Sequence, residues 1–185
     1  MGCERFLETT IVIEQLEKAG EFLAAGLPNR LREVVTFELT HGLHDRLESP
    51  LEAAFSVWWH AISFGEYPEP ALRLRQQRTV DLSDRRYRID FVVEGQNFQW
   101  PTSTRPRPKI AIELDGHEFH ERTKSQVADR NKRDRDLQLA GWVVFHISGS
   151  EFYHQPDRVA IETYNAALKL FRDWFTDAVL SGEPR

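Results

Sequence analysis

The alternation of apolar and polar residues predicts a central set of strands. Residues 72–80 and 85–93 each alternate as a strand does, and the short polar stretch 81–84 between them indicates a hairpin. Residues 109–115 predict a third strand, and residues 142–147 predict a short buried fourth strand. Three strands are therefore expected close together in the chain, with the fourth separated from them by a longer interval.

Helical patterns flank these strands. The capping-box pattern at residues 49–52, with serine, proline and glutamate in the favoured places, predicts a helix that runs to about Phe64. A charged helix is expected over residues 123–140 with Gly141 as its C-cap, and residues 157–180 carry apolar side chains at helical spacing. The core elements thus follow the order helix, three strands, helix, strand, and a further helix packs on them.

The remaining segments are less regular. Residues 7–23 indicate a mostly helical segment, residues 31–47 fit either a strand or a helix, and residues 95–108, with three prolines, predict a long loop. The expected organisation is a mostly helical N-terminal extension (1–48), a core (49–155) and a C-terminal helix packed on that core (156–185).

The third predicted strand carries two acids on one face. Residues two apart in a strand point to the same side, so Glu113 and Asp115 point together, away from the apolar face of the strand. Two like charges about 7 Å apart repel unless a cation, a proton or an arginine compensates them. A hard divalent cation is the leading candidate, and the pattern therefore predicts a metal site.

The distribution of charge changes the picture of the partner. A net charge of −5 would by itself argue against a nucleic-acid partner, but residues 73–135 hold 15 basic against 10 acidic residues, while both flanking parts are acidic. Basic side chains around an acidic centre are typical of a site for a phosphate-bearing substrate. The alternative is a set of solvated faces without a partner.

Composition and hydropathy limit the location of the protein. The single cysteine, Cys3, excludes an internal disulfide and a cysteine-based zinc site. The longest apolar stretch, 53–64, is too short to span a bilayer, and the N-terminus lacks the basic start and apolar centre of a signal peptide. We therefore expect a cytoplasmic protein that does not interact with a membrane.

Several motifs in order along the chain carry a resemblance to a known family. They are Asp90 within residues 87–91, the acidic strand 112–116, the pair Phe119 and His120, and Asp129, Arg133 and Leu137 ahead of Gly141. With the element order, they resemble the restriction-endonuclease-like, or PD-(D/E)xK, nucleases, in particular small bacterial endonuclease-domain proteins related to very-short-patch-repair endonucleases. Over roughly residues 49–155 the resemblance implies an α/β fold with an αβββαβ core, a mixed sheet flanked by helices, and extra helical segments at both ends.

This resemblance implies a divalent-metal-dependent deoxyribonuclease acting in DNA repair, restriction or defence, with Mg²⁺ or Mn²⁺ as cofactor and duplex or structured DNA as substrate. Asp90, Glu113 and Asp115 would hold the metal. Glu52 would orient the water or a second ion, and His120 would act as base or acid. Asp115 occupies the position where the superfamily signature has a lysine, which leaves open what handles the proton.

Each assignment has a simpler alternative. Helix capping alone explains Glu52, and salt bridges four residues apart within residues 123–140 explain most of the charges there. The basic residues expected to contact nucleic acid are Arg88, Arg105, Arg107, Lys124, Arg130 and Arg133. A catalytically silent nucleic-acid-binding or protein-interaction module remains the alternative function, and the acidic N-terminal segment is a candidate surface for a homodimer or another protein.

Overall fold

The computed structural model describes residues 47–65, 72–82, 85–95, 105–116 and 124–180. The expectations for the N-terminal extension, and those for most of the proline-containing loop, lie outside the described residues. The elements are α3 (Pro50–Gly65), β1 (Leu72–Leu82), β2 (Arg85–Gly95), β3 (Lys109–Asp115), α4 (Lys124–Leu139), β4 (Trp142–Ser148), α5 (Gly149–His154) and α6 (Pro156–Leu180).

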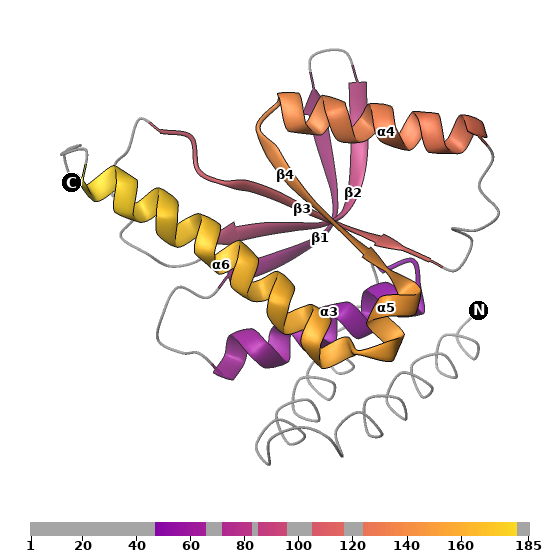
Figure 1. Ribbon diagram of the computed structural model, residues 1–185, viewed down its shortest axis with the longest axis horizontal. Helices are drawn as coiled ribbons and strands as arrows, with labels where there is room; N and C mark the ends of the chain where they lie inside the picture. Colours follow the sequence, from indigo (N-terminus) through magenta and orange to yellow (C-terminus); the bar gives the residue numbers. More distant parts are fainter. Residues whose placement is uncertain (1–46, 66–71, 83–84, 96–104, 117–123, 181–185) are drawn as a thin grey trace.

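The four strands form one mixed sheet in the order β1-β2-β3-β4 (Figure 1). β1 pairs with β2, and β2 with β3, in antiparallel fashion, whereas β3 and β4 are parallel. Parallel neighbours need a crossover connection, and α4 lies in it. The predicted fold class, an αβββαβ core with helices flanking a mixed sheet, is therefore confirmed.

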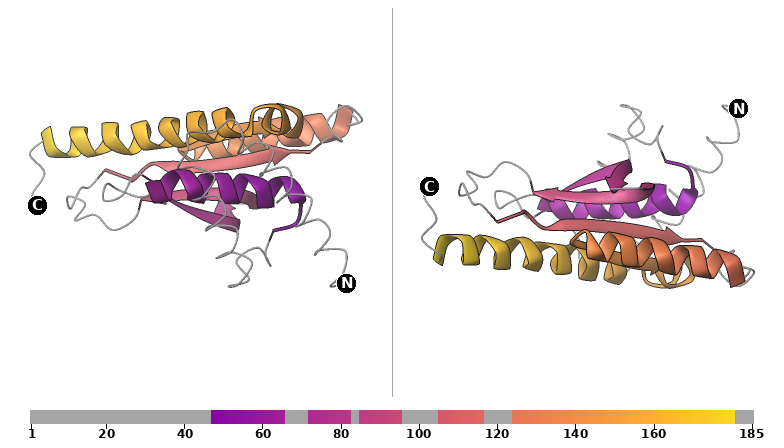
Figure 2. Two further views of the ribbon diagram at one scale, coloured as in Figure 1. Left: turned by 90° about the horizontal axis from the view of Figure 1, so that it is seen from below. Right: turned by 90° about the horizontal axis from the view of Figure 1, so that it is seen from above.

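The two faces of the sheet are covered differently. One face packs against α3, α5 and α6 in a large apolar core that includes Phe91 and Ile112 of the sheet. The other face carries a small cluster of Ile89, Val92 and Ala111, and α4 contributes Leu137 to it. Figure 2 shows α3 and α6 running lengthwise beside the strands. The helix α4 is thus attached to the sheet through little apolar surface.

The start of α3 follows the predicted capping box. The Ser49 hydroxyl accepts a hydrogen bond from the Glu52 amide at 3.2 Å and donates one to Glu52 Oε1 at 2.9 Å. Further along the helix, Phe55, Trp58 and Trp59 are fully buried. Burying such large rings contributes several kcal/mol to the core, so this cap fixes the helix that carries much of the apolar packing.

Two features differ from the sequence expectation. The short helix α5 was not predicted, because six residues are too few to carry a periodic pattern; its N-cap, Ser148, accepts from the Glu151 amide at 3.2 Å. β1 and β2 extend two residues beyond their predicted ends because they pair as a long hairpin. None of the helices in the described ranges has the length and apolar character needed to cross a membrane.

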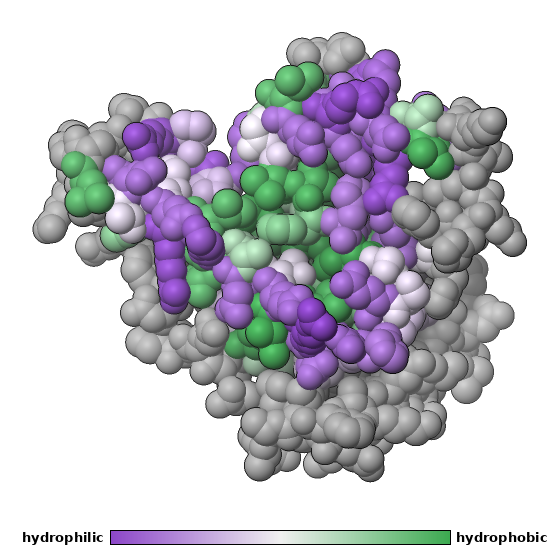
Figure 3. All heavy atoms as spheres, viewed as in Figure 1, coloured by the Kyte–Doolittle hydropathy of each residue, from purple (hydrophilic) through white to green (hydrophobic). Residues whose placement is uncertain are grey.

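Apolar side chains also reach the surface. Figure 3 shows them gathered in the middle of the viewed face, between the polar surfaces of α4 and α6. Val143 of β4 is 39% exposed, and Leu139 at the end of α4 is 88% exposed. The strand β4 lies at one edge of the described sheet, so this apolar surface borders a sheet edge.

Gly141 closes α4 as predicted and adopts the left-handed conformation, with φ +82°. We expect Gly141→Ala to lower the free energy of unfolding by about 1 kcal/mol, because a Cβ disfavours this backbone geometry. Urea denaturation measures the loss. Gly116→Ala is the control, since a Cβ meets no atom within 4 Å at either glycine but only Gly141 of the two has a left-handed backbone. Equal stability of the two variants would contradict the prediction.

Candidate functional site

Two buried carboxylates lie on the α4 side of β3. Glu113 and Asp115 are each 7% exposed, and Ala111 on the same strand face belongs to the cluster that includes Leu137 of α4. Ile110 and Ile112 belong to the opposite core. The expected alternation along β3 is therefore present, and it places both acids between the sheet and a helix rather than in open solvent.

Asp90 reaches the same region because β2 separates from β3. The two strands pair only at three positions, the last being Phe91 opposite Ile112. Beyond it, Asp90 Oδ2 accepts the Leu114 amide at 2.9 Å, so a side chain replaces the missing backbone partner. Since Leu114 lies between Glu113 and Asp115 in the chain, this bond places Asp90 beside the acidic pair.

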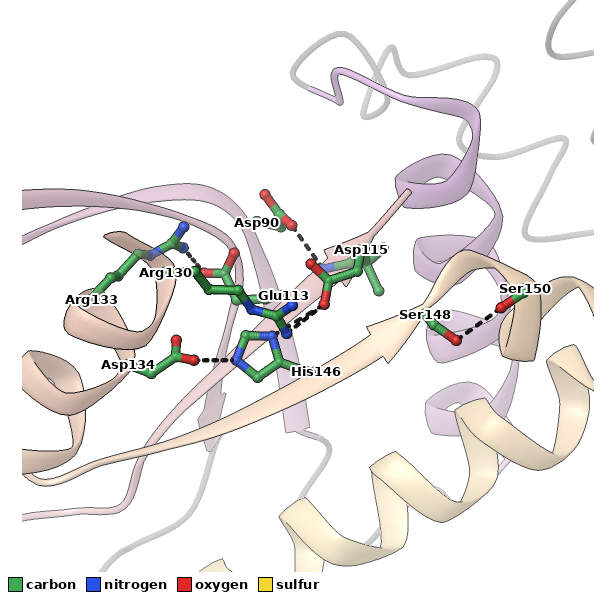
Figure 4. A network of polar contacts seen from close by, with 10 residues as sticks. Asp90, Glu113, Asp115, Arg130, Arg133, Asp134, His146, Ser148 and Ser150 are labelled. Carbon is green, nitrogen blue, oxygen red and sulfur yellow. Dashed lines mark hydrogen bonds and ion pairs between the residues drawn. The ribbon is translucent and has the colours of Figure 1, made fainter. Parts of the chain in front are cut away.

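The arginines of α4 face these acids, as Figure 4 shows. Arg130 Nη2 lies 2.7 Å from Asp115 Oδ2. Arg133 Nη2 forms an ion pair with Glu113 Oε1 and also donates to the Arg88 carbonyl at 2.9 Å. Residues three apart share a helix face, so both guanidinium groups reach the sheet together.

The expectation that salt bridges within α4 explain most of its charges is therefore corrected. Arg130 and Arg133 contact the β3 acids, the Asp134 carboxylate meets His146, and Asp136 Oδ2 accepts from the Tyr87 hydroxyl at 2.5 Å. The sequence spacing did not account for buried partners on the sheet, which compete for the same side chains. Four charged residues of α4 thus attach the helix to the strands.

His146 of β4 is a site residue that the sequence analysis missed. It lies opposite Glu113 in the parallel register, with Nδ1 3.4 Å from Asp115 Oδ2 and Nε2 3.1 Å from Asp134 Oδ2. Alternation along residues 142–147 places His146 on the same face as Val144, and this pattern could have indicated its orientation. The register between β3 and β4 could not have been predicted, because no local pattern encodes it.

Burial is the largest influence on the pKa values of Glu113 and Asp90. It raises the pKa of Glu113 from its ordinary value of 4.5 to about 7; the Arg133 charge opposes this shift and the Asp90 charge adds to it. Burial also raises the pKa of Asp90. The hydrogen bond from the Leu114 amide lowers this pKa, and the charge of Glu52 raises it further. Arg133 therefore compensates the Glu113 carboxylate only in part, and a further cation would be favourable here.

Glu52 is held by the capping contacts. Its carboxylate accepts from the Glu48 amide at 3.1 Å, the Ser49 hydroxyl at 2.9 Å and the Gln77 side-chain amide at 2.7 Å. Gln77 has a φ of 47°, and its Oε1 is buried without a hydrogen-bond partner. The capping interpretation thus accounts for the contacts of Glu52, while its charge still acts on Asp90.

Among the other predicted residues, Arg88 and Arg105 form ion pairs with residues other than the three acids, although the charge of Arg88 acts on Asp90. Arg88 forms a two-point ion pair with Glu48, at 2.5 and 2.6 Å. Arg105 contacts Asp177 of α6 at 3.2 Å. Arg105 and the exposed Arg107 both precede the first residue of β3, whereas the acids lie at the last residues of that strand. His120 and the side chain of Lys124 lie outside the described residues.

The oxygen donors of Asp90, Glu113 and Asp115 suit a hard divalent cation such as Mg²⁺ or Mn²⁺. Within the described ranges, however, no three histidine, cysteine, aspartate or glutamate side chains are arranged to hold a metal ion. Glu113 and Asp115 each turn an oxygen toward a guanidinium group. The donor chemistry fits the metal, and one oxygen of each β3 acid already contacts an arginine.

The mixed sheet, the acidic strand and the flanking helices are those of a restriction-endonuclease-like protein. The REase_MTES_1575 family model, from a restriction-endonuclease-like family, matches residues 73–167, about half of the chain. The chain belongs to this family. The matched region contains the β2 and β3 acids, the α4 arginines and His146, but not Glu52. No curated protein and no solved structure gives a significant match.

The raised pKa of Glu113 makes stability depend on pH. The contribution of the neutral carboxyl is complete below about pH 4.5 and is lost as the pH rises through about 7, so ionisation lowers the free energy of unfolding by about 3 kcal/mol at most. We expect urea unfolding at pH 5 and pH 8 to differ less for Glu113→Gln than for the wild type. An equal difference in both proteins would disprove the assignment.

Proposed function

We propose that the protein is a divalent-metal-dependent deoxyribonuclease that hydrolyses phosphodiester bonds. The observation that carries the proposal is the convergence of Asp90, Glu113 and Asp115, from two strands, beside two arginines in a restriction-endonuclease-like core. The buried acids are suitable ligands for a metal ion, and the adjacent guanidinium groups are suitable hydrogen-bond donors to a phosphate. DNA as substrate agrees with the family and with the basic middle part of the chain.

Asp90, Glu113 and Asp115 would hold Mg²⁺ or Mn²⁺. When bound, such an ion activates a water molecule and offsets the negative charge that develops on the phosphate. The chain contributes the remaining steps. Burial between α4 and the sheet strengthens every charge interaction, and the Leu114 amide fixes the orientation of Asp90.

Proton transfer is assigned to Glu113 and His146. In the protein without a cation, burial raises the pKa of Glu113 to about 7, so its carboxyl group exchanges a proton near neutral pH. His146, between Asp115 and Asp134, is held with one ring nitrogen toward each carboxylate and can relay a proton between them. His120 remains a predicted base or acid, on the resemblance alone.

A catalytically silent module that binds DNA or protein is the second candidate. The ion pairs of Arg130 and Arg133 favour it, because they compensate Asp115 and Glu113 without a metal. The two candidates differ in one respect, which is whether phosphodiester cleavage depends on both a divalent cation and the acids.

Nicking of supercoiled plasmid in Mg²⁺ or Mn²⁺ tests the proposal. We expect Asp90→Asn and Glu113→Gln each to lower the cleavage rate about 100-fold or more, since each removes a charge needed to hold the cation. The matched control is Glu94→Gln, on the same strand as Asp90 but paired with Arg75 outside the cluster. If the wild type shows no metal-dependent nicking, or if the two variants cut like the control, the silent module is the better description.

Glu52 can be tested separately from the cap that it forms. Ser49→Ala removes the capping hydroxyl but keeps the Glu52 charge, whereas Glu52→Gln removes the charge that acts on Asp90. Both variants are expected to lose about 1 kcal/mol of unfolding free energy. Only Glu52→Gln is expected to change the nicking rate. Unchanged nicking in both would limit Glu52 to helix capping.

A further inference from the structure

Arg130 and Arg133 compensate the charges that a bound cation would compensate. Each places Nη2 against a different buried acid, Asp115 and Glu113 respectively, and both side chains are largely shielded, with 21% and 28% of their surface exposed. Two guanidinium charges and one divalent ion carry the same total charge. The guanidinium groups and the cation therefore compete for the same carboxylate oxygens, because a carboxylate that is paired with an arginine binds a cation more weakly.

Arg133 is incompletely satisfied in this arrangement. Its Nη2 is shared between Glu113 and the Arg88 carbonyl, while its Nε is buried and makes no hydrogen bond. A buried donor without an acceptor is destabilising. A phosphodiester presents two non-bridging oxygens, to which a guanidinium can donate through two groups at once.

The attachment of α4 permits such an exchange. Of the α4 residues whose burial is described, only Leu137 is buried. The other described contacts of the helix with the sheet are polar and include the two arginine pairs, the Asp134 contact with His146 and the Tyr87 bond to Asp136. Side chains held by ion pairs can change partner without disrupting apolar packing.

We propose that Arg130 and Arg133 are exchangeable counterions that couple metal binding to phosphodiester binding. In the free protein they form ion pairs with Asp115 and Glu113. When a divalent cation takes these carboxylates, the two guanidinium groups turn to the phosphate of the substrate. Metal and DNA then bind with positive cooperativity, because each removes the partner that the other must displace. This role rests on the proposed metal-dependent function and specifies how its site is regulated.

The first test measures metal binding without DNA. Free Mn²⁺ is quantified by electron paramagnetic resonance during titration of the full chain at constant ionic strength. We expect Arg130→Gln with Arg133→Gln to bind Mn²⁺ about tenfold more tightly than the wild type, because the competing charges are gone. Arg135→Gln, an exposed arginine of the same helix, is the matched control and should bind like the wild type.

The second test measures the coupling itself. A short labelled duplex is titrated by fluorescence anisotropy with and without Ca²⁺, and a gel checks that the duplex stays intact. In the wild type, Ca²⁺ is expected to strengthen duplex binding about tenfold. In the double variant, duplex binding should be weaker and Ca²⁺ should give no such gain. The control Arg135→Gln should retain the gain.

Arg133→Lys keeps the test decisive if the double variant does not fold, which circular dichroism would reveal. Lysine keeps the counterion but not the two-point donor, so Mn²⁺ affinity should stay near that of the wild type while duplex binding weakens. Equal Mn²⁺ affinity in the wild type and the folded double variant would overturn the exchange and leave the proposed function standing. Absence of Mn²⁺ binding in every protein would overturn the proposed function itself.

Discussion

The burial of like charges beneath α4 is the constraint on which the rest of the site depends. Two carboxylates withdrawn from water on one strand cost several kcal/mol each unless opposite charges or hydrogen bonds replace the lost hydration. The structure meets that cost with Arg130, Arg133 and His146, which all face the acidic strand. The same contacts hold α4 on a sheet face where little apolar surface is available. The same ion pairs therefore both compensate the buried acids and position the helix.

Most elements of the core could be predicted because their signals are local. The alternation along β3, the capping box of α3 and the glycine after α4 each act within a few residues, and each is found in the structure. α5 has no such signal, since it is a single short helix. The pairing of β3 with β4 as parallel neighbours also lacked one, because register between distant segments depends on how the helices pack around the sheet.

The site divides in the same way. That Glu113 and Asp115 share a face follows from the period of a strand. That Asp90 joins them depends on the point where β2 leaves β3, which the sequence does not encode locally. For Arg130 and Arg133, spacing along the helix indicated bonds within α4, whereas the buried acids proved the stronger partners. The general lesson is that a buried unpaired charge takes precedence over a solvated pair four residues apart.

The parallel pairing of β3 and β4 around α4 has one further consequence. Glu113, the arginines and His146 all belong to a single strand-helix-strand unit, so the contacts among them lie within one stretch of the chain. Most of the polar network can therefore assemble within one contiguous segment, and only Asp90 has to be supplied by a separate hairpin. A loop inserted between β2 and β3 would leave that segment whole while changing how Asp90 is delivered to it.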